Sequence, residues 1–304
     1  MTRSTRIIAG LIVAIIAFAA ILSGLVAIGV TGAKSAKAKL NDPGVVTGDI
    51  PDEKSDFVVV YAQATSLDVV AQSAKFSIYF DFSASLAVNG THSAVITEAP
   101  GPINITVGND VFSFKTGAPM FSKSISVPVY GDTSLYPFDS YYAEFPIFAT
   151  FGDTSKPLTV LSASLGSPSG FASSYDFATV DGTRDQMGEA LFTRSKTTRT
   201  FAILISLFMW GLSLCASSLS VILWVGDRKV EPPHIIFTSA LLFALPGIRS
   251  AMPGAPAIGA MVDQLVLVWC MSLLCMAEVI YFLRFIWANK PVVAKAESAP
   301  FVVA

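Results

Sequence analysis

Four apolar stretches divide this chain of 304 residues, and three of them are long enough to cross a lipid bilayer. Residues 7–30, 201–225 and 264–287 are runs in which charges are rare, and an α-helix of 24 residues reaches about 36 Å. The remaining stretch, residues 235–248, crosses only if its helix begins near Pro233; otherwise it breaks at Pro246 and re-enters. We expect it to cross, which gives four transmembrane helices.

The first apolar run has a second interpretation, as a cleaved signal peptide. Ala36 and Ala38 are small residues that fit a cleavage site. The apolar core of a signal peptide, however, is about 7 to 15 residues long. Because residues 7–30 exceed that length, we expect an uncleaved membrane anchor.

The segment between the first two apolar runs has the period-two pattern of β-strands. Apolar residues alternate with polar ones, which sends one set of side chains to each face of a strand. The alternating sets are Phe76/Ile78/Phe80/Phe82, Ile103/Ile105/Val107, Ile125/Val127/Val129 and Phe145/Ile147/Ala149/Phe151, with Phe112/Phe114 as a shorter case. Turn residues such as Gly108-Asn109 separate them. Strands at this spacing predict an antiparallel β-sandwich of about seven or more strands.

The predicted fold class is a membrane protein of α plus β type, with the antiparallel β-sandwich inserted between the first and second of four transmembrane helices. The expected divisions are a cytoplasmic tip with the first helix, a linker, the extracytoplasmic β-sandwich, helices two to four, and a cytoplasmic tail: residues 1–30, 31–55, 56–199, 200–287 and 288–304. Within the sandwich region, residues 166–199 are rich in Gly, Ser and Thr. We expect them to form a looser return to the membrane.

Basic residues beside the apolar runs bear on the orientation of the protein. Cytoplasmic loops carry an excess of Lys and Arg, but the rule is weak beside long translocated domains. Arg3, Arg6, Arg228 and Lys229 lie on the side of the termini, whereas the basic residues on the other side mostly flank the long domain. We therefore expect a plasma-membrane protein with both termini in the cytoplasm. Its expected partners are the lipid bilayer and other membrane proteins.

Composition agrees with a membrane protein, since 53% of the residues are apolar and 14% are charged. Residues 31–199 carry 12 Lys and Arg against 17 Asp and Glu, so we expect no nucleic-acid partner. The three cysteines, Cys215, Cys270 and Cys275, all lie in apolar runs. This placement predicts no disulfide in the β domain.

Candidates for catalysis are few in this sequence. His92 is the one histidine of the β-rich segment and lies beside the turn residues Asn89-Gly90. No catalytic serine motif, cysteine or second histidine accompanies it there. We expect a protein that is not an enzyme, with no catalytic residue, cofactor or metal.

Glu278 is an acidic residue 14 positions into the last apolar run, deep enough for its carboxyl to lie in the hydrocarbon. If the second and fourth helices run in the same direction, equal depth places it near Ser213, Ser217 and Ser218. These residues form a predicted intramembrane polar site. It serves either as a proton or cation relay or as a neutral acid with a structural role.

Arg249 and Asp263 bracket a segment rich in Pro and Gly, residues 251–259. We expect an ion pair between them to close the hairpin of the third and fourth helices at the outer interface. Its role would be architectural rather than catalytic.

The segment Tyr136-Pro137-Phe138-Asp139 predicts a turn in which Pro137 fixes φ and Asp139 accepts hydrogen bonds from local backbone. Tyr136, Phe138 and Tyr141 would then meet the lipid interface or the helix hairpin. With Ala143-Glu144-Phe145, Phe243–Arg249, Pro253–Gly259 and Asp263, this segment resembles the membrane family called domain of unknown function 4436, DUF4436. The resemblance implies a bacterial or fungal multi-pass protein of unassigned activity, and it carries over no catalytic residue.

Tyr136-Pro137-Phe138-Asp139 is also similar to the Phe-Pro-x-Asp loop of pentameric ligand-gated channels, whose β-sandwich couples to four membrane helices. Here a predicted helix precedes the sandwich and flanking cysteines are absent, which argues against channel gating. Our first hypothesis is therefore a cell-envelope protein that acts as a binding, scaffold or assembly module. The alternative is a transport or channel component that uses Glu278.

Overall fold

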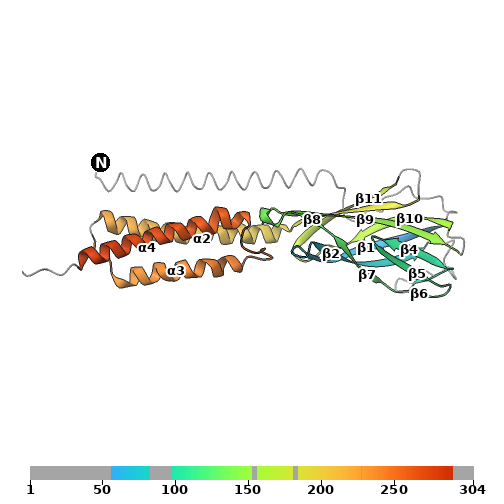
Figure 1. The fold of residues 1–304 in the computed structure, drawn as a ribbon, viewed down its shortest axis with the longest axis horizontal. Coiled ribbons are helices and arrows are strands. Elements are labelled where there is room, and N and C mark those ends of the chain that lie inside the picture. The colour runs from blue at the N-terminus through green and yellow to red at the C-terminus, as the bar shows by residue number, and fades with distance from the viewer. Residues whose placement is uncertain (1–55, 83–96, 153–155, 181–183, 227, 290–304) are drawn as a thin grey trace, which may run out of the picture. The chain divides into compact units, whose positions relative to one another are not determined.

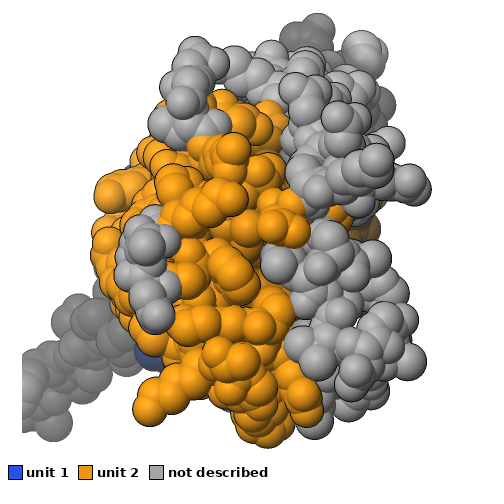
Figure 2. All heavy atoms as spheres, turned by 90° about the vertical axis from the view of Figure 1, so that its right-hand side faces the viewer, with its two compact units in different colours: residues 1–17, 204–251, 263–304 blue, residues 18–203, 252–262 orange. Residues whose placement is uncertain are grey.

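A computed structural model describes residues 56–82, 97–152, 156–180, 184–226 and 228–289. These residues fall into two compact units. The β unit comprises the described residues up to Ile203 together with Met252–Val262 (orange in Figure 2), and the helical unit comprises Leu204–Ala251 and the residues from Asp263 onward. The predicted first helix, the linker and His92 lie outside the described residues.

The β unit contains one ten-stranded sheet among the described residues. Its main path runs β11-β12-β9-β10-β1-β2-β7, while β4 and β8 pair with β9, and β5 pairs with β4 (Figure 1). The strands are β1 (Phe57–Asp68), β2 (Ser73–Phe82), β4 (Ile103–Val107), β5 (Asp110–Phe114), β7 (Lys123–Pro128), β8 (Tyr130–Gly131), β9 (Ser140–Phe151), β10 (Lys156–Leu165), β11 (Phe171–Thr179) and β12 (Gln186–Arg194). Two short strands, β3 (Thr97–Glu98) and β6 (Pro119–Met120), form a separate pair.

The core lies between the β1–β2 side and the β9–β12 side of this sheet. Phe76 of β2 packs on Phe145 of β9 and Phe192 of β12, with ring centroids 5.2 and 6.2 Å apart. The predicted alternation is confirmed for most positions, because the apolar members of β2, β4, β7 and β9 are buried except the half-buried Phe151, and their neighbours are more exposed except Thr106, which is also buried. Burial of these large side chains is the main stabilising contribution available to a β unit for which the sequence predicts no disulfide.

The sheet departs from the purely antiparallel sandwich that we expected. β10 first pairs antiparallel with β9, with Leu158 opposite Ala149, and then pairs parallel with β1, with Val160 opposite Val58. By pairing with both, β10 joins the two sides into one sheet that nearly closes, like a barrel. The alternation of residues determines which face of a strand is buried, but not which strand lies beside it.

Residues 166–199 also differ from the looser return that we expected. β11 and β12 form a regular hairpin over Phe171–Arg194, and β12 continues the sheet by pairing with β9. Small residues obscured the strand pattern because they are weak strand signals. One of them is required by packing: a Cβ on Gly188 would lie 2.8 Å from the Phe145 ring.

The helices are α2 (Lys196–Val225), α3 (Pro232–Ser250) and α4 (Val268–Ala288), and a single π-helical turn, η3 (Asp263–Leu267), leads into α4. Two helical segments, Lys196–Val225 and Asp263–Ala288, are long and apolar enough to cross a membrane. α3 begins at Pro232 and continues through Pro246, so the helix starts near Pro233 as we expected and the alternative of a break at Pro246 is wrong. The expected set of four transmembrane helices is not supported, because the first lies outside the described residues and α3 has polar ends at His234 and Arg249.

Candidate functional site

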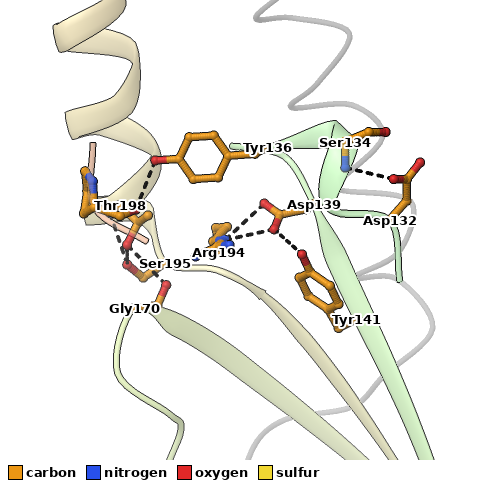
Figure 3. A network of polar contacts seen from close by, with 10 residues as sticks. Asp132, Ser134, Tyr136, Asp139, Tyr141, Gly170, Arg194, Ser195 and Thr198 are labelled. Atoms are coloured by element: carbon orange, nitrogen blue, oxygen red, sulfur yellow. Dashed lines mark hydrogen bonds and ion pairs between the residues drawn. The ribbon is translucent and has the colours of Figure 1, made fainter. Parts of the chain in front are cut away.

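A deeply buried ion pair of the β unit joins Arg194 to Asp139. Nε of Arg194 donates to both carboxylate oxygens of Asp139, at 3.1 Å from Oδ1 and 3.0 Å from Oδ2 (Figure 3). The two side chains are 3% and 0% exposed. We call these two residues, together with Tyr136, Tyr141 and Phe171, the Arg194 cluster.

Strand register explains how residues so far apart in the chain come to meet. β12 and β9 are antiparallel, with Thr193 opposite Ser140. Continuing that register by one residue places Arg194 opposite Asp139, on the buried face. The loop before Asp139 is fixed by a 3-10 turn, η2 (Thr133–Leu135), whose preceding residue Asp132 accepts a hydrogen bond from the Ser134 amide at 2.8 Å. Hydrogen bonding from Ser134 also lowers the pKa of Asp132.

Aromatic rings enclose the ion pair. The guanidinium carbon of Arg194 lies 4.4 Å from the centroid of the Phe171 ring and 5.2 Å from that of Tyr136. Tyr141 donates a hydrogen bond from its hydroxyl to Oδ2 of Asp139 at 2.7 Å. Burial, and then this hydrogen bond to Asp139, raises the pKa of Tyr141. A charge held in this way is well ordered, and removal of one partner would leave the other buried and unpaired.

The cluster also holds the Met252–Val262 loop. The hydroxyl of Tyr136 donates to the backbone carbonyl of Pro253 at 3.0 Å. The next residue, Gly254, has φ of +63°, and a Cβ there would lie 2.6 Å from Nη1 of Arg194. Glycine is therefore favoured at this position for two independent reasons, backbone conformation and space.

The start of α2 is attached to the same region. Ser195 follows Arg194, and its Oγ accepts a hydrogen bond from the amide of Thr198 at 3.2 Å, as an N-cap residue does. Thr198 in turn donates to the carbonyl of Gly170, also at 3.2 Å (Figure 3). The first turn of α2 is thus hydrogen-bonded to Gly170, the residue directly before Phe171 of the Arg194 cluster.

The structure changes the role expected for the Tyr136–Asp139 segment. Asp139 pairs with Arg194 and Tyr141, rather than with local backbone. Tyr136 contacts the predicted hairpin loop through Pro253, while Tyr141 is buried in the core of the β unit. Pro137 follows a cis peptide bond, and Phe138 is half-buried. Sequence reasoning missed Arg194, although it is the final member of the alternating buried set of β12.

Arg249 and Asp263 meet in the helical unit, as the sequence led us to expect. Nε of Arg249 donates to Oδ1 of Asp263 at 2.6 Å, and Nη2 donates to Oδ2 at 2.8 Å. This bidentate geometry, with two parallel hydrogen bonds, is a strong form of a guanidinium–carboxylate pair. Both side chains are buried, and they join the last turn of α3 to the first residue of η3. The architectural role of the pair remains a prediction.

Glu278 does not lie against the serines expected to surround it. Its Oε1 accepts a hydrogen bond from Ser239 of α3 at 2.7 Å. Ser217 instead donates to backbone carbonyls, including that of Leu273, and within the described residues neither Ser213 nor Ser218 donates to Glu278. The predicted site is therefore corrected to one between α3 and α4. Equal depth correctly placed Glu278 at the level of these serines along the helix axis. It could not show which neighbouring helix the side chain faces.

Metal ligation has no support in the described ranges. They contain no group of three or more His, Cys, Asp or Glu side chains placed to hold a metal ion.

Comparisons with protein families give two matches. Residues 49–188 match the family model described as "Domain of unknown function (DUF4436)", which covers most of the β unit. Residues 194–288 match a second model, "Domain of unknown function (DUF8686)", which begins at Arg194 and covers the described helices. No curated protein matches this chain.

Proposed function

We propose that this chain, which belongs to the DUF4436 family, is a non-enzymatic multi-pass membrane protein of the cell envelope that acts as a binding, scaffold or assembly module. In this proposal the β unit lies outside the plasma membrane and both termini lie in the cytoplasm. Residues 7–30, α2, α3 and α4 would each cross the bilayer.

The observation that carries the proposal is the Arg194 cluster. Its buried charges serve to hold chain segments together, since they join β9, β12 and the Met252–Val262 loop directly before α2. Buried ion pairs and hydrogen bonds hold the elements that they join in fixed positions, and here Nε of Arg194 makes these bonds while Nη2 is buried without a partner in the described residues. A rigid base is what a module needs if it presents a β surface to a partner beside a membrane.

The helices support membrane placement by length and composition. Two of the segments are long and apolar enough to cross, and α3, with 19 residues, would be about 28 Å long, close to the thickness of a bilayer core. Pairing with Asp263 also reduces the cost of placing Arg249 at the membrane interface.

Affinity capture and reconstitution together test the proposal. The tagged full-length chain is cross-linked in cells, purified in mild detergent, and separately reconstituted into lipid vesicles. We expect a second protein to co-purify in a fixed ratio, and vesicles no more permeable to ions than vesicles with an unrelated membrane protein. A chain that purifies only with copies of itself and makes vesicles permeable would contradict a scaffold role.

A further inference from the structure

The Glu278 carboxyl is only half satisfied within the described residues. Ser239 donates to Oε1, whereas Oε2 is sealed from solvent and has no hydrogen-bond partner in the described chain. Glu278 lies ten residues before the end of α4 at Ala288, or about 15 Å along the helix, so it is far from the helix terminus. An oxygen placed in this way needs either a proton or a cation.

Polar side chains on α3 lead from Glu278 toward the start of that helix. Glu231, directly before α3, and His234 and Thr238 within it follow one another at the i,i+3 and i,i+4 spacing of helical neighbours, and Ser239 is the residue after Thr238, about 100° further around the helix. His234 stacks near Tyr281 of α4, with ring centroids 6.1 Å apart, and the Thr238 hydroxyl donates to the His234 carbonyl at 3.0 Å. Tyr281 lies three residues beyond Glu278 on α4. We call Tyr281, His234 and the exposed Glu231 the His234–Tyr281 line.

The charges near Glu278 do not balance a carboxylate. The titratable groups of the neighbouring helix ends are His234 on α3, whose ring lies near Tyr281 of α4, and the exposed Glu231 directly before α3, while α2 contributes the Ala216 carbonyl to which Tyr281 donates. Arg249 is engaged by Asp263, and Arg284 lies over the Trp224 ring, 5.9 Å from its centroid. An ionised acid among apolar helices without a cationic partner is costly, whereas its protonated form is neutral.

We propose that Glu278 is a proton-binding site between α3 and α4, with Ser239 as its hydrogen-bond donor and the His234–Tyr281 line as its path for proton exchange. Oε2 carries the proton. This inference rests on the membrane placement proposed above, and it goes beyond a scaffold role because it gives the helices a titratable site.

Labelling with dicyclohexylcarbodiimide tests this site, because a protonated carboxyl adds across the reagent and rearranges to a stable N-acylurea that retains the whole reagent mass. The full-length chain is labelled in phosphatidylcholine–phosphatidylglycerol vesicles and its peptides are weighed. We expect an adduct on Glu278 and none on Asp263, which is held as a carboxylate by Arg249. Because only the protonated carboxyl adds to the reagent, labelling should be lost when the reaction is run in alkaline buffer. Glu278→Gln should abolish the adduct, and His234→Asn should slow its formation.

Three outcomes would overturn the proposal. They are an absent adduct on Glu278 at mildly acidic pH in folded chain, labelling that does not respond to pH, and protection by sodium ions at constant pH, which would indicate a metal cation instead. Glu278→Asp keeps the carboxyl and provides a folded variant if Glu278→Gln aggregates. Resistance to alkaline carbonate extraction tests membrane placement separately, so failure of that premise is distinguishable from failure of the proton site.

Discussion

Arg194 and Asp139 are 55 positions apart in the sequence, yet Nε of the first lies 3.0 Å from Oδ2 of the second, with both side chains buried. The contact is set by the antiparallel register of β9 and β12 and is completed by rings of Phe171 and Tyr136. Arg194 is the last residue of β12, and α2 begins two residues later, so the ion pair lies where the sheet passes into the first turn of α2. Predictions about this cluster are the most direct tests of the structure.

Replacing Asp139 by Asn should destabilise the β unit strongly. The change keeps the shape of the side chain but leaves the Arg194 charge buried and unpaired, which costs about 3–5 kcal/mol. Thermal unfolding in detergent measures the loss. Asp110→Asn is the matched control, because Asp110 is exposed on the β4–β5 turn, and its midpoint should stay within about 1 °C of wild type for a change well under 0.5 kcal/mol. Equal midpoints for the two variants would contradict the role of the pair.

Comparison of Gly254→Ala with Gly117→Ala separates the cost of steric crowding from the cost of backbone strain. Gly254 and Gly117 both have positive φ, +63° and +71°, but a Cβ at Gly254 would meet Nη1 of Arg194 whereas nothing lies within 4 Å of one at Gly117. Both variants should lose about 1 kcal/mol from strain, and Gly254→Ala should lose about 1–3 kcal/mol more from crowding of a packed group. The measurement is again the unfolding midpoint. A larger loss for Gly117→Ala would show that the loop is not held as described.

Tyr141→Phe should reduce both stability and alkaline sensitivity. The pKa of Tyr141 is raised in the folded state, so the neutral hydroxyl is favoured by folding. The stabilisation is complete below the ordinary tyrosine pKa of about 10 and is lost as pH rises toward the folded value, because the unfolded chain then binds fewer protons. The variant loses a hydrogen bond to a charged acceptor, about 1.5–3 kcal/mol.

The pH dependence is followed as unfolding midpoints between neutral pH and about pH 11. Wild type should lose stability over the alkaline part of this range, and Tyr141→Phe should lose less of it. Tyr142→Phe is an informative comparison, since burial and then hydrogen bonding to Glu144 raise the pKa of Tyr142 on the other face of the same strand. A steeper alkaline loss in Tyr141→Phe than in wild type would contradict the assigned hydrogen bond.

Arg249→Lys should weaken the closure of α3 on η3. Lysine keeps the charge but cannot donate two parallel hydrogen bonds to Asp263, so we expect a loss of about 1–3 kcal/mol. Limited proteolysis at the Met252–Val262 loop and the unfolding midpoint report this change. Lys229→Arg is a control, because Lys229 is exposed before α3. Unchanged cleavage and stability in Arg249→Lys would argue against an architectural role.

Sequence patterns predicted where the strands and helices lie in the chain better than they predicted which strands pair. The alternation of Phe76 and Ile78 identified β2 and its buried face, and the ends of the apolar runs matched α2 and α4 closely. Pairing was not accessible, because β10 changes partner from β9 to β1 without a change in its residue pattern. Asp139 was noticed but Arg194 was not, since their contact depends on that register.

Rotation of a helix about its axis was the second source of error. Depth placed Glu278 level with serines of α2, and the two helices do run in the same direction, with Ser217 contacting Leu273 and Trp224 contacting Trp287. Ala277 and Tyr281, however, occupy the buried face that packs toward Leu223 and Ala216. Glu278 is one residue further on, about 100° around the helix, and so faces α3.

The proposed membrane orientation is tested most directly by cysteine accessibility in intact cells. Two single-cysteine chains, Ser124→Cys on β7 and Asn289→Cys after α4, are made with Cys215, Cys270 and Cys275 replaced, and each is treated with a membrane-impermeant maleimide. With the proposed orientation, Ser124→Cys should be labelled in intact cells and Asn289→Cys only after permeabilisation. Labelling of Asn289→Cys in intact cells, with Ser124→Cys protected until permeabilisation, would contradict it.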